Sequence, residues 1–124
     1  MHLVFIGLGG FAGAIARYLV DGWATGLGRG TFPWGTLAVN LSGSLLIGIL
    51  FALMVERAAI ASEWRGPLMI GFIGSYTTFS TLMLESWTLV EEGDIAHMLF
   101  NLAGSVVIGM IAVVAGLALG RALP

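Results

Sequence analysis

The stretch GFIGSYTTFSTLMLE, residues 71–85, places a run of hydroxyl groups inside an otherwise apolar segment. Six of the seven residues from Ser75 to Thr81 are serine, threonine or tyrosine, and Gly71 and Gly74 precede them. Such residues contribute little helix propensity, and their hydroxyls compete for backbone hydrogen bonds. The run therefore predicts a break in a helix, although serine and threonine in membrane helices often only bond back to the preceding turn.

The composition of the whole chain indicates the solvent around this stretch. Of 124 residues, 58% are hydrophobic and 10% are charged, and the mean hydropathy is +1.00. These values are typical of a membrane protein, in which a helix needs about 20 apolar residues to cross the bilayer. We expect one all-α transmembrane domain over residues 1–124, with helices at 3–23, 33–55, 67–90 and 95–119. Almost no chain is left over for a soluble catalytic domain.

The sequence argues against a metal cluster and against a cleaved signal peptide. Without cysteine there is no thiolate metal site, and His2 and His97 lie near predicted helix ends far apart in the sequence, so we expect no metal cluster. Met1 and His2 provide no basic segment of the kind that begins a signal peptide, so we expect the first helix to be retained.

The arginines give little orientation bias. Arg57, Arg65 and Arg121 fall on the side of the N-terminus, whereas Arg17 and Arg29 fall on the other. Because Lys/Arg asymmetry sets topology, three against two leaves two outcomes open. Either the first helix imposes one orientation, or the chain inserts both ways and forms an antiparallel homodimer.

An internal repeat places polar groups at corresponding positions of the second and fourth helices. NLSGSLLIG (40–48) and NLAGSVVIG (101–109) agree at six of nine positions. Asparagine and serine are four residues apart in each copy, so both face the same side of the helix. A polar side chain in hydrocarbon needs a partner. The repeat is therefore either an adhesive contact between helices or part of a polar path.

The hydroxyl run falls near the bilayer midplane, because the third helix is centred near Thr78. A broken helix is tolerated at that depth where its freed groups are buried in protein or line a polar cavity. The donors there carry no fixed charge, which disfavours a proton-coupled antiporter with a central carboxylate. Several neutral donors, together with the positive edge of the Phe79 ring, instead favour a permeation path for an anion.

Three segments carry a resemblance to a known family. GGFAGAIARY (9–18), GTLAVNLSGS (35–44) and GFIGSYTTFSTLMLE (71–85) resemble the signature segments of the Fluc/CrcB family of fluoride ion channels. The resemblance extends over nearly the whole chain. It implies a passive, fluoride-selective channel in the bacterial inner membrane, built as a dual-topology antiparallel homodimer with two pores. Such a channel exports fluoride from the cytoplasm and lowers its toxicity.

The resemblance also implies roles for single residues. It assigns the fluoride pathway to Asn40, Phe79, Ser80, Thr81 and Ser105. It implies a structural sodium ion at the dimer centre, held by the backbone carbonyls of Gly74 and Thr77 from each subunit, and oxygen ligands suit this hard cation. Arg17 and Glu85 match charged positions of the family, where each has a vestibule or a purely structural role.

Two residues depart from the family pattern, and two other protein classes stay open. Leu82 replaces a usual phenylalanine and Ser75 a usual glycine. Three candidates remain to supply the aromatic ring that Leu82 lacks: Tyr76, Phe100 or a homologous partner in a heterodimer. A small multidrug-type proton-coupled antiporter has similar length and topology, but its mechanism requires a membrane-embedded carboxylate in the first helix. In this chain the first helix has only Asp21, near its end. A structural subunit of a larger complex is the third reading.

Overall fold

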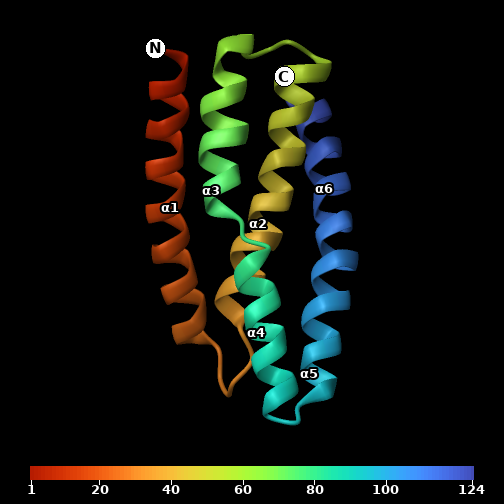
Figure 1. The fold of residues 1–124 in the computed structure, drawn as a ribbon. Helices are drawn as coiled ribbons and strands as arrows, with labels where there is room; N and C mark the ends of the chain where they lie inside the picture. The colour runs from red at the N-terminus through yellow and green to blue at the C-terminus, as the bar shows by residue number, and fades with distance from the viewer.

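The computed structural model describes residues 1–124 and contains helices but no strands. Four helices are long and apolar enough to cross a membrane, which confirms the predicted number of spans. They run over His2–Leu27, Trp34–Glu56, Ser62–Glu91 and Ile95–Ala122, so each is a few residues displaced from or longer than predicted. Figure 1 shows an upright bundle with both termini at one end.

The first two spans are continuous. α1 covers His2–Leu27, and α2 covers Trp34–Phe51 and continues as a π-helical segment, η1, over Ala52–Glu56. The turn between them contains Gly30 at φ +80°, a backbone conformation that favours glycine. Pro33 immediately precedes α2, where its missing N–H removes no helical hydrogen bond.

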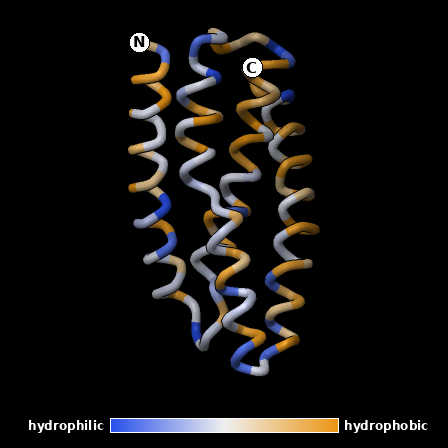
Figure 2. The backbone as a smooth tube through the Cα atoms, in the orientation of Figure 1, coloured by the Kyte–Doolittle hydropathy of each residue, from blue (hydrophilic) through white to orange (hydrophobic).

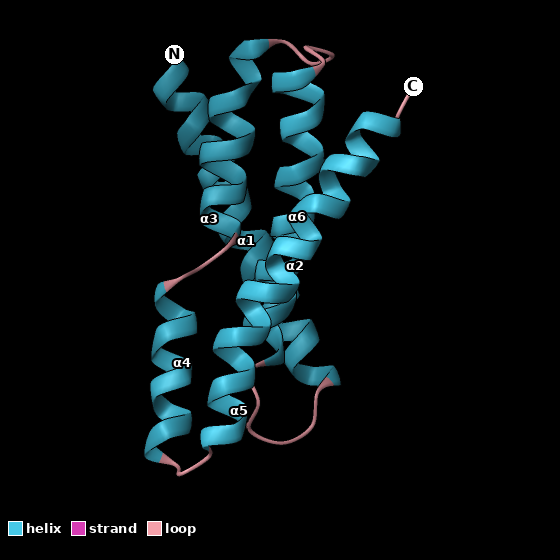
Figure 3. Cartoon of the chain, turned by 90° about the vertical axis from the view of Figure 1, so that its right-hand side faces the viewer, coloured by secondary structure: helices cyan, strands magenta, loops and turns pink.

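The third span is interrupted, as the hydroxyl run predicted. Its first half comprises a short 3-10 turn, a π-helical segment and one helical turn, namely η2 (Ser62–Trp64), η3 (Gly66–Ile73) and α3 (Gly74–Tyr76). Thr77 is extended, with φ −88° and ψ 160°, and the helix resumes as α4 at Ser80–Glu91. Figures 1 and 3 show α4 displaced sideways from α3 at mid-height of the bundle.

The fourth span follows a capped turn. α5 (Ile95–Leu99), a π-helical segment η4 (Phe100–Gly104) and α6 (Ser105–Ala122) form one rod. Asp94 caps its start, because its carboxylate accepts the His97 backbone N–H at 3.2 Å and contacts His97 Nδ1 at 2.6 Å. These hydrogen bonds, first from the side chain and then from the backbone of His97, lower the pKa of the Asp94 carboxyl.

Glycines let the helices pack with their backbones in contact. A methyl group at Gly13 of α1 would overlap the backbone of Phe72, so α1 lies directly against the first half of the broken span. A methyl group at Gly116 of α6 would likewise overlap the carbonyl of Leu45 in α2. Small residues at such crossings allow the close approach that membrane helices use for association.

Hydrophilic residues lie at the two ends of the bundle, and between the ends the tube is mostly white to orange with a few blue segments, one of them at mid-height of α1 (Figure 2). At the end that carries the termini, Arg57 donates hydrogen bonds to the carbonyls of Gly120 and Leu123. Arg121 pairs with Glu56 through two hydrogen bonds at 2.7 and 2.8 Å. These contacts join the ends of the second and fourth spans.

Candidate ion pathway

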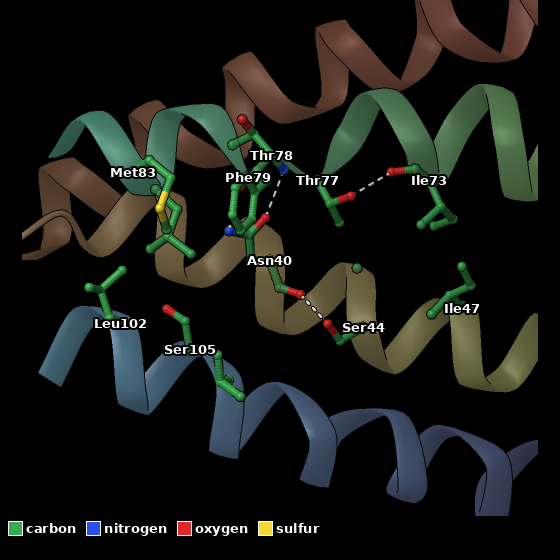
Figure 4. A pocket seen from close by; sticks show the side chains of 13 residues that line it. Asn40, Ser44, Ile47, Ile73, Thr77, Thr78, Phe79, Met83, Leu102 and Ser105 are labelled. Carbon is green, nitrogen blue, oxygen red and sulfur yellow. Dashed lines mark hydrogen bonds between the residues drawn. The ribbon is translucent and has the colours of Figure 1, made fainter. Parts of the chain in front are cut away.

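The break in the third span is clamped by Asn40 from α2. The Thr78 N–H donates to Asn40 Oδ1 at 2.8 Å (Figure 4). In return, Asn40 Nδ2 donates to the Thr78 carbonyl at 2.9 Å. One amide side chain thus pairs with both backbone groups of one residue, using one of its two N–H donors. The clamp satisfies polar groups that leaving the helix would otherwise strand in the membrane.

Thr78 in turn caps the second half of the broken span. The Thr81 N–H donates to Thr78 Oγ1 at 3.2 Å, and the Thr78 hydroxyl donates to Thr81 Oγ1 at 3.1 Å. Phe79 is the N-cap residue of α4 by position, and the oxygen of the preceding Thr78 accepts one of the N–H groups that a helix start leaves unpaired. The two hydroxyls therefore help α4 restart directly after the break.

The four carbonyl oxygens at the end of the first half of the span, those of Gly74, Ser75, Tyr76 and Thr77, accept no hydrogen bond within the chain. The Thr78 N–H, which would bond to Gly74 O in a continuous helix, goes to Asn40, and the Thr81 N–H, the usual partner of Thr77 O, goes to Thr78 Oγ1. Gly74 is also exposed on the surface of the single chain. Unpaired backbone oxygens of this kind fit a hard cation such as sodium.

A central cavity of about 370 Å³ lies beside the clamp. It is lined by residues of α2, both sides of the break, η4 and the first turn of α6, and Figure 4 shows Asn40, Phe79 and Ser105 around it. The Ser105 Oγ is buried and has no hydrogen-bond partner. Phe79 is 75% exposed in the single chain. The cavity therefore offers neutral donors and a ring but no charged side chain.

A second, polar cavity of about 340 Å³ lies near α1. Its lining consists of Ala14, Arg17, Tyr18, Asp21, Thr36, Val39, Thr78 and Thr81. Thr78 belongs to the lining of both cavities, so they meet at the clamp. Arg17 makes no ion pair or hydrogen bond within the chain, which leaves its guanidinium free to interact with an anion.

The predicted pathway residues are divided between these cavities. Asn40, Phe79 and Ser105 line the central cavity, whereas Thr81 lines the polar cavity. Arg17, for which a vestibule or structural role was predicted, also lines the polar cavity. The family resemblance assigned the four pathway residues Asn40, Phe79, Thr81 and Ser105 to one path and did not indicate two cavities.

Two other predicted residues line neither cavity. Ser80 is exposed, and its hydroxyl lies 3.4 Å from Thr78 Oγ1. Glu85 contacts the polar cavity only indirectly, because its Oε1 accepts a hydrogen bond at 2.9 Å from Thr36, which lines that cavity. The other carboxylate oxygen of Glu85 is buried without a partner.

The position of the missing ring is occupied by an aliphatic side chain. Leu82 is buried and lines the central cavity beside Phe79. Tyr76 and Phe100 line neither cavity, and the Phe100 ring packs on Phe32 with centroids 5.3 Å apart. Neither alternative therefore supplies a second ring to the central cavity from within the same chain.

Sequence reasoning missed Thr36 as a site residue. It lies four residues before Asn40, as Asn40 lies four before Ser44, and the Ser44 hydroxyl donates to the Asn40 carbonyl at 2.7 Å. This i,i+4 series predicts one polar stripe along α2. Extending the spacing one turn toward the N-terminus would have found Thr36.

The fold and site together define an integral membrane protein of the channel and transporter kind, with a helix broken at mid-depth between polar-lined cavities. The chain belongs to the CrcB family, because the sequence model of the family described as "CrcB-like protein, Camphor Resistance (CrcB)" matches residues 4–117. This confirms the resemblance seen in the three signature segments.

Individual relatives agree with this assignment. The chain is 45% identical over 120 residues to the fluoride-specific ion channel FluC of Hahella chejuensis, covering 97% of this chain and 94% of that one. It is 42% identical over 123 residues to the protein of the same name from Agrobacterium fabrum, covering 99% and 98%. The corresponding protein of Methylococcus capsulatus is 47% identical over an alignment of 127 positions, which covers 99% of this chain and 54% of that longer one. These relatives are named as channels, not enzymes, and lend no support to the antiporter alternative.

Proposed function

We propose that this protein is a fluoride-specific passive ion channel that exports fluoride from the cytoplasm. The observation that carries the proposal is the likeness, over 97% of the chain, to a relative named a fluoride-specific ion channel. The site supports it, because neutral donors surround the central cavity without a fixed charge that would trap the ion.

The two cavities suggest an order of contacts along the path. Arg17 attracts the anion into the polar cavity, where Thr81 provides a hydroxyl. The ion then passes Thr78 into the central cavity. There the second N–H of Asn40 and the unpaired Ser105 hydroxyl act as donors, and the Phe79 ring presents its positive edge.

The surface at the break supports an antiparallel homodimer. An unpaired backbone carbonyl exposed to lipid costs several kcal/mol, so the oxygens of Gly74 and Thr77 need a covering surface. A second, inverted copy covers both, and a structural sodium ion held by these carbonyls of each chain compensates them. The dimer then has two pores and inserts in the bacterial inner membrane. Leu82 keeps a heterodimer with a homologue as the alternative assembly.

Fluoride efflux from liposomes that contain the purified protein tests this function. We expect efflux after addition of a potassium ionophore without any proton gradient, and we expect chloride to be retained. The measurement is the external fluoride concentration from an ion-selective electrode, with protein-free liposomes as the control. Proton-coupled exchange of an organic cation would support the antiporter instead, and absence of any flux would support the structural subunit.

Dual topology predicts that loops at both ends of the bundle reach the cell exterior. The chain has no native cysteine, and Thr31 and Ala61 are exposed in loops at opposite ends. In intact cells, Thr31→Cys and Ala61→Cys should each react with a membrane-impermeant thiol reagent to about half the extent seen after the membrane is opened. Labelling of only one of the two variants would show a single orientation.

A further inference from the structure

A tyrosine just before the break is hydrogen-bonded to α2. The Tyr76 hydroxyl lies 2.8 Å from Ser42 Oγ, and Tyr76 is 5% exposed. Ser42 Oγ also lies 2.7 Å from the carbonyl of Ala38, one turn earlier in the same helix. Serine has a single hydroxyl proton, which goes to that carbonyl, so Tyr76 is the donor in the pair with Ser42.

The Tyr76 ring packs on Phe72 of the same span and lies against α2. It stacks on Phe72, with centroids 5.9 Å apart and planes 10° from parallel. The Phe72 backbone packs directly on Gly13 of α1. On the other side, a methyl group at Gly43 of α2 would overlap the Thr77 side chain and lie 3.2 Å from the Tyr76 ring. The last turn before the break is therefore fixed against both helices.

The Tyr76–Ser42 hydrogen bond lies directly beside the unpaired carbonyl oxygens of the break. Tyr76 lies between Gly74 and Thr77, the two residues whose carbonyls the proposed function assigns to sodium, within a run of four carbonyl oxygens that accept no hydrogen bond in the chain. Ser42 and Tyr76 line neither the central nor the polar cavity. An effect of the Tyr76 hydroxyl on ions therefore has to act through the backbone at the break.

We infer that Tyr76 is a positioning residue, whose hydrogen bond to Ser42 fixes the peptide groups before the break as Asn40 fixes those after it. This inference rests on the proposed function, in which the carbonyls of Gly74 and Thr77 hold sodium. The cation takes the place of the hydrogen-bond donors that these two carbonyl oxygens do not have within the chain. A pair of carbonyls held in place before the cation arrives binds it more tightly, because less ordering remains to be done.

The test is the sodium dependence of dimer stability in detergent, measured by thermal unfolding as sodium replaces potassium at constant ionic strength. Tyr76→Phe removes one oxygen and keeps the ring packed on Phe72. We expect the variant to need about fivefold more sodium for half-maximal stabilisation, the change that losing one typical hydrogen bond produces. The sodium concentration that supports half-maximal fluoride efflux should shift in the same direction.

Two further variants form a cycle with the first. Ser42→Ala leaves the buried Tyr76 hydroxyl without its acceptor, so its sodium shift should equal or exceed that of Tyr76→Phe. The Ser42→Ala/Tyr76→Phe double variant should show no larger shift than Ser42→Ala alone, because the pair acts as a unit. Thr88→Val is the matched control, since it also removes a hydroxyl, one that is exposed and bonds only to the Leu84 carbonyl of its own helix.

The outcomes separate this inference from the proposed function. An unshifted sodium dependence in Tyr76→Phe, or a wild-type dimer that sodium does not stabilise, would overturn the inference while leaving fluoride conduction intact. Equal shifts in Tyr76→Phe and Thr88→Val would also overturn it, because any lost hydroxyl would then suffice. A wild-type protein that conducts no fluoride would overturn the proposed function itself, whatever the sodium dependence of the dimer.

Discussion

Replacing Asn40 by aspartate is expected to lower fluoride efflux by about 100-fold or more. The ionised carboxylate cannot donate to the Thr78 carbonyl, which now lies 2.9 Å from Asn40 Nδ2, and two acceptors would face each other there. Loss of such a buried partner costs about 1–3 kcal/mol, which is up to about 150-fold in an equilibrium. The new negative charge beside the central cavity also repels the anion.

Asn40→Ala separates these two causes. It removes the clamp on Thr78 without adding charge, so an efflux rate between those of the wild type and Asn40→Asp would assign part of the loss to each cause. Equal losses in the two variants would assign the whole effect to the clamp. The measurement is the initial efflux rate from liposomes, made on protein that elutes as a dimer. Wild-type efflux from a folded Asn40→Asp dimer would contradict both roles.

The four spans and the break were predictable from the sequence for a physical reason. Charged residues are excluded from hydrocarbon, so their clusters mark the ends of the spans, and the low helix propensity from Ser75 to Thr81 marks the interruption. The extent of the break was not predictable. It covers only Thr77–Phe79, because Thr78 caps α4 and restores the helix at Ser80.

The role of each hydroxyl at the break was harder to predict. Ser80 and Thr81 are neighbours in sequence, yet Thr81 lines the polar cavity and Ser80 is exposed. Successive residues of a helix point about 100° apart, so their directions depend on the rotation of α4 about its axis. The extended backbone at Thr77 resets that rotation, and the sequence contains no measure of it.

The internal repeat illustrates the same limit. Asn40 and Asn101 occupy equivalent positions of the two copies, but only Asn40 contacts backbone at the break. Asn101 is fully buried, donates to Ser86 Oγ at 2.9 Å and leaves its Oδ1 unpaired. Because the spacing is the same in both copies, each asparagine lies on the same face of its helix as the serine four residues later. The partner of each amide, however, depends on which helix packs against that face, and the repeat does not determine this.

Phe79→Ile is expected to lower fluoride efflux by about tenfold. The substitution keeps an apolar side chain at the wall of the central cavity but removes the ring, whose positive edge stabilises an anion. A contact worth about 1.4 kcal/mol corresponds to this factor. Little change in folding is expected, because Phe79 is 75% exposed in the single chain and fills no space in its core.

Phe11→Ile is the matched control for this substitution. Phe11 is 69% exposed on α1 and lines neither cavity, so the same chemical change there should leave efflux at the wild-type rate. Both variants should elute as dimers before their initial efflux rates are compared. If Phe79→Ile conducts fluoride as fast as Phe11→Ile, the ring at the break does not contact the ion. The path would then run through the amide and hydroxyl donors alone, with Asn40 and Ser105 as its remaining contacts in the central cavity.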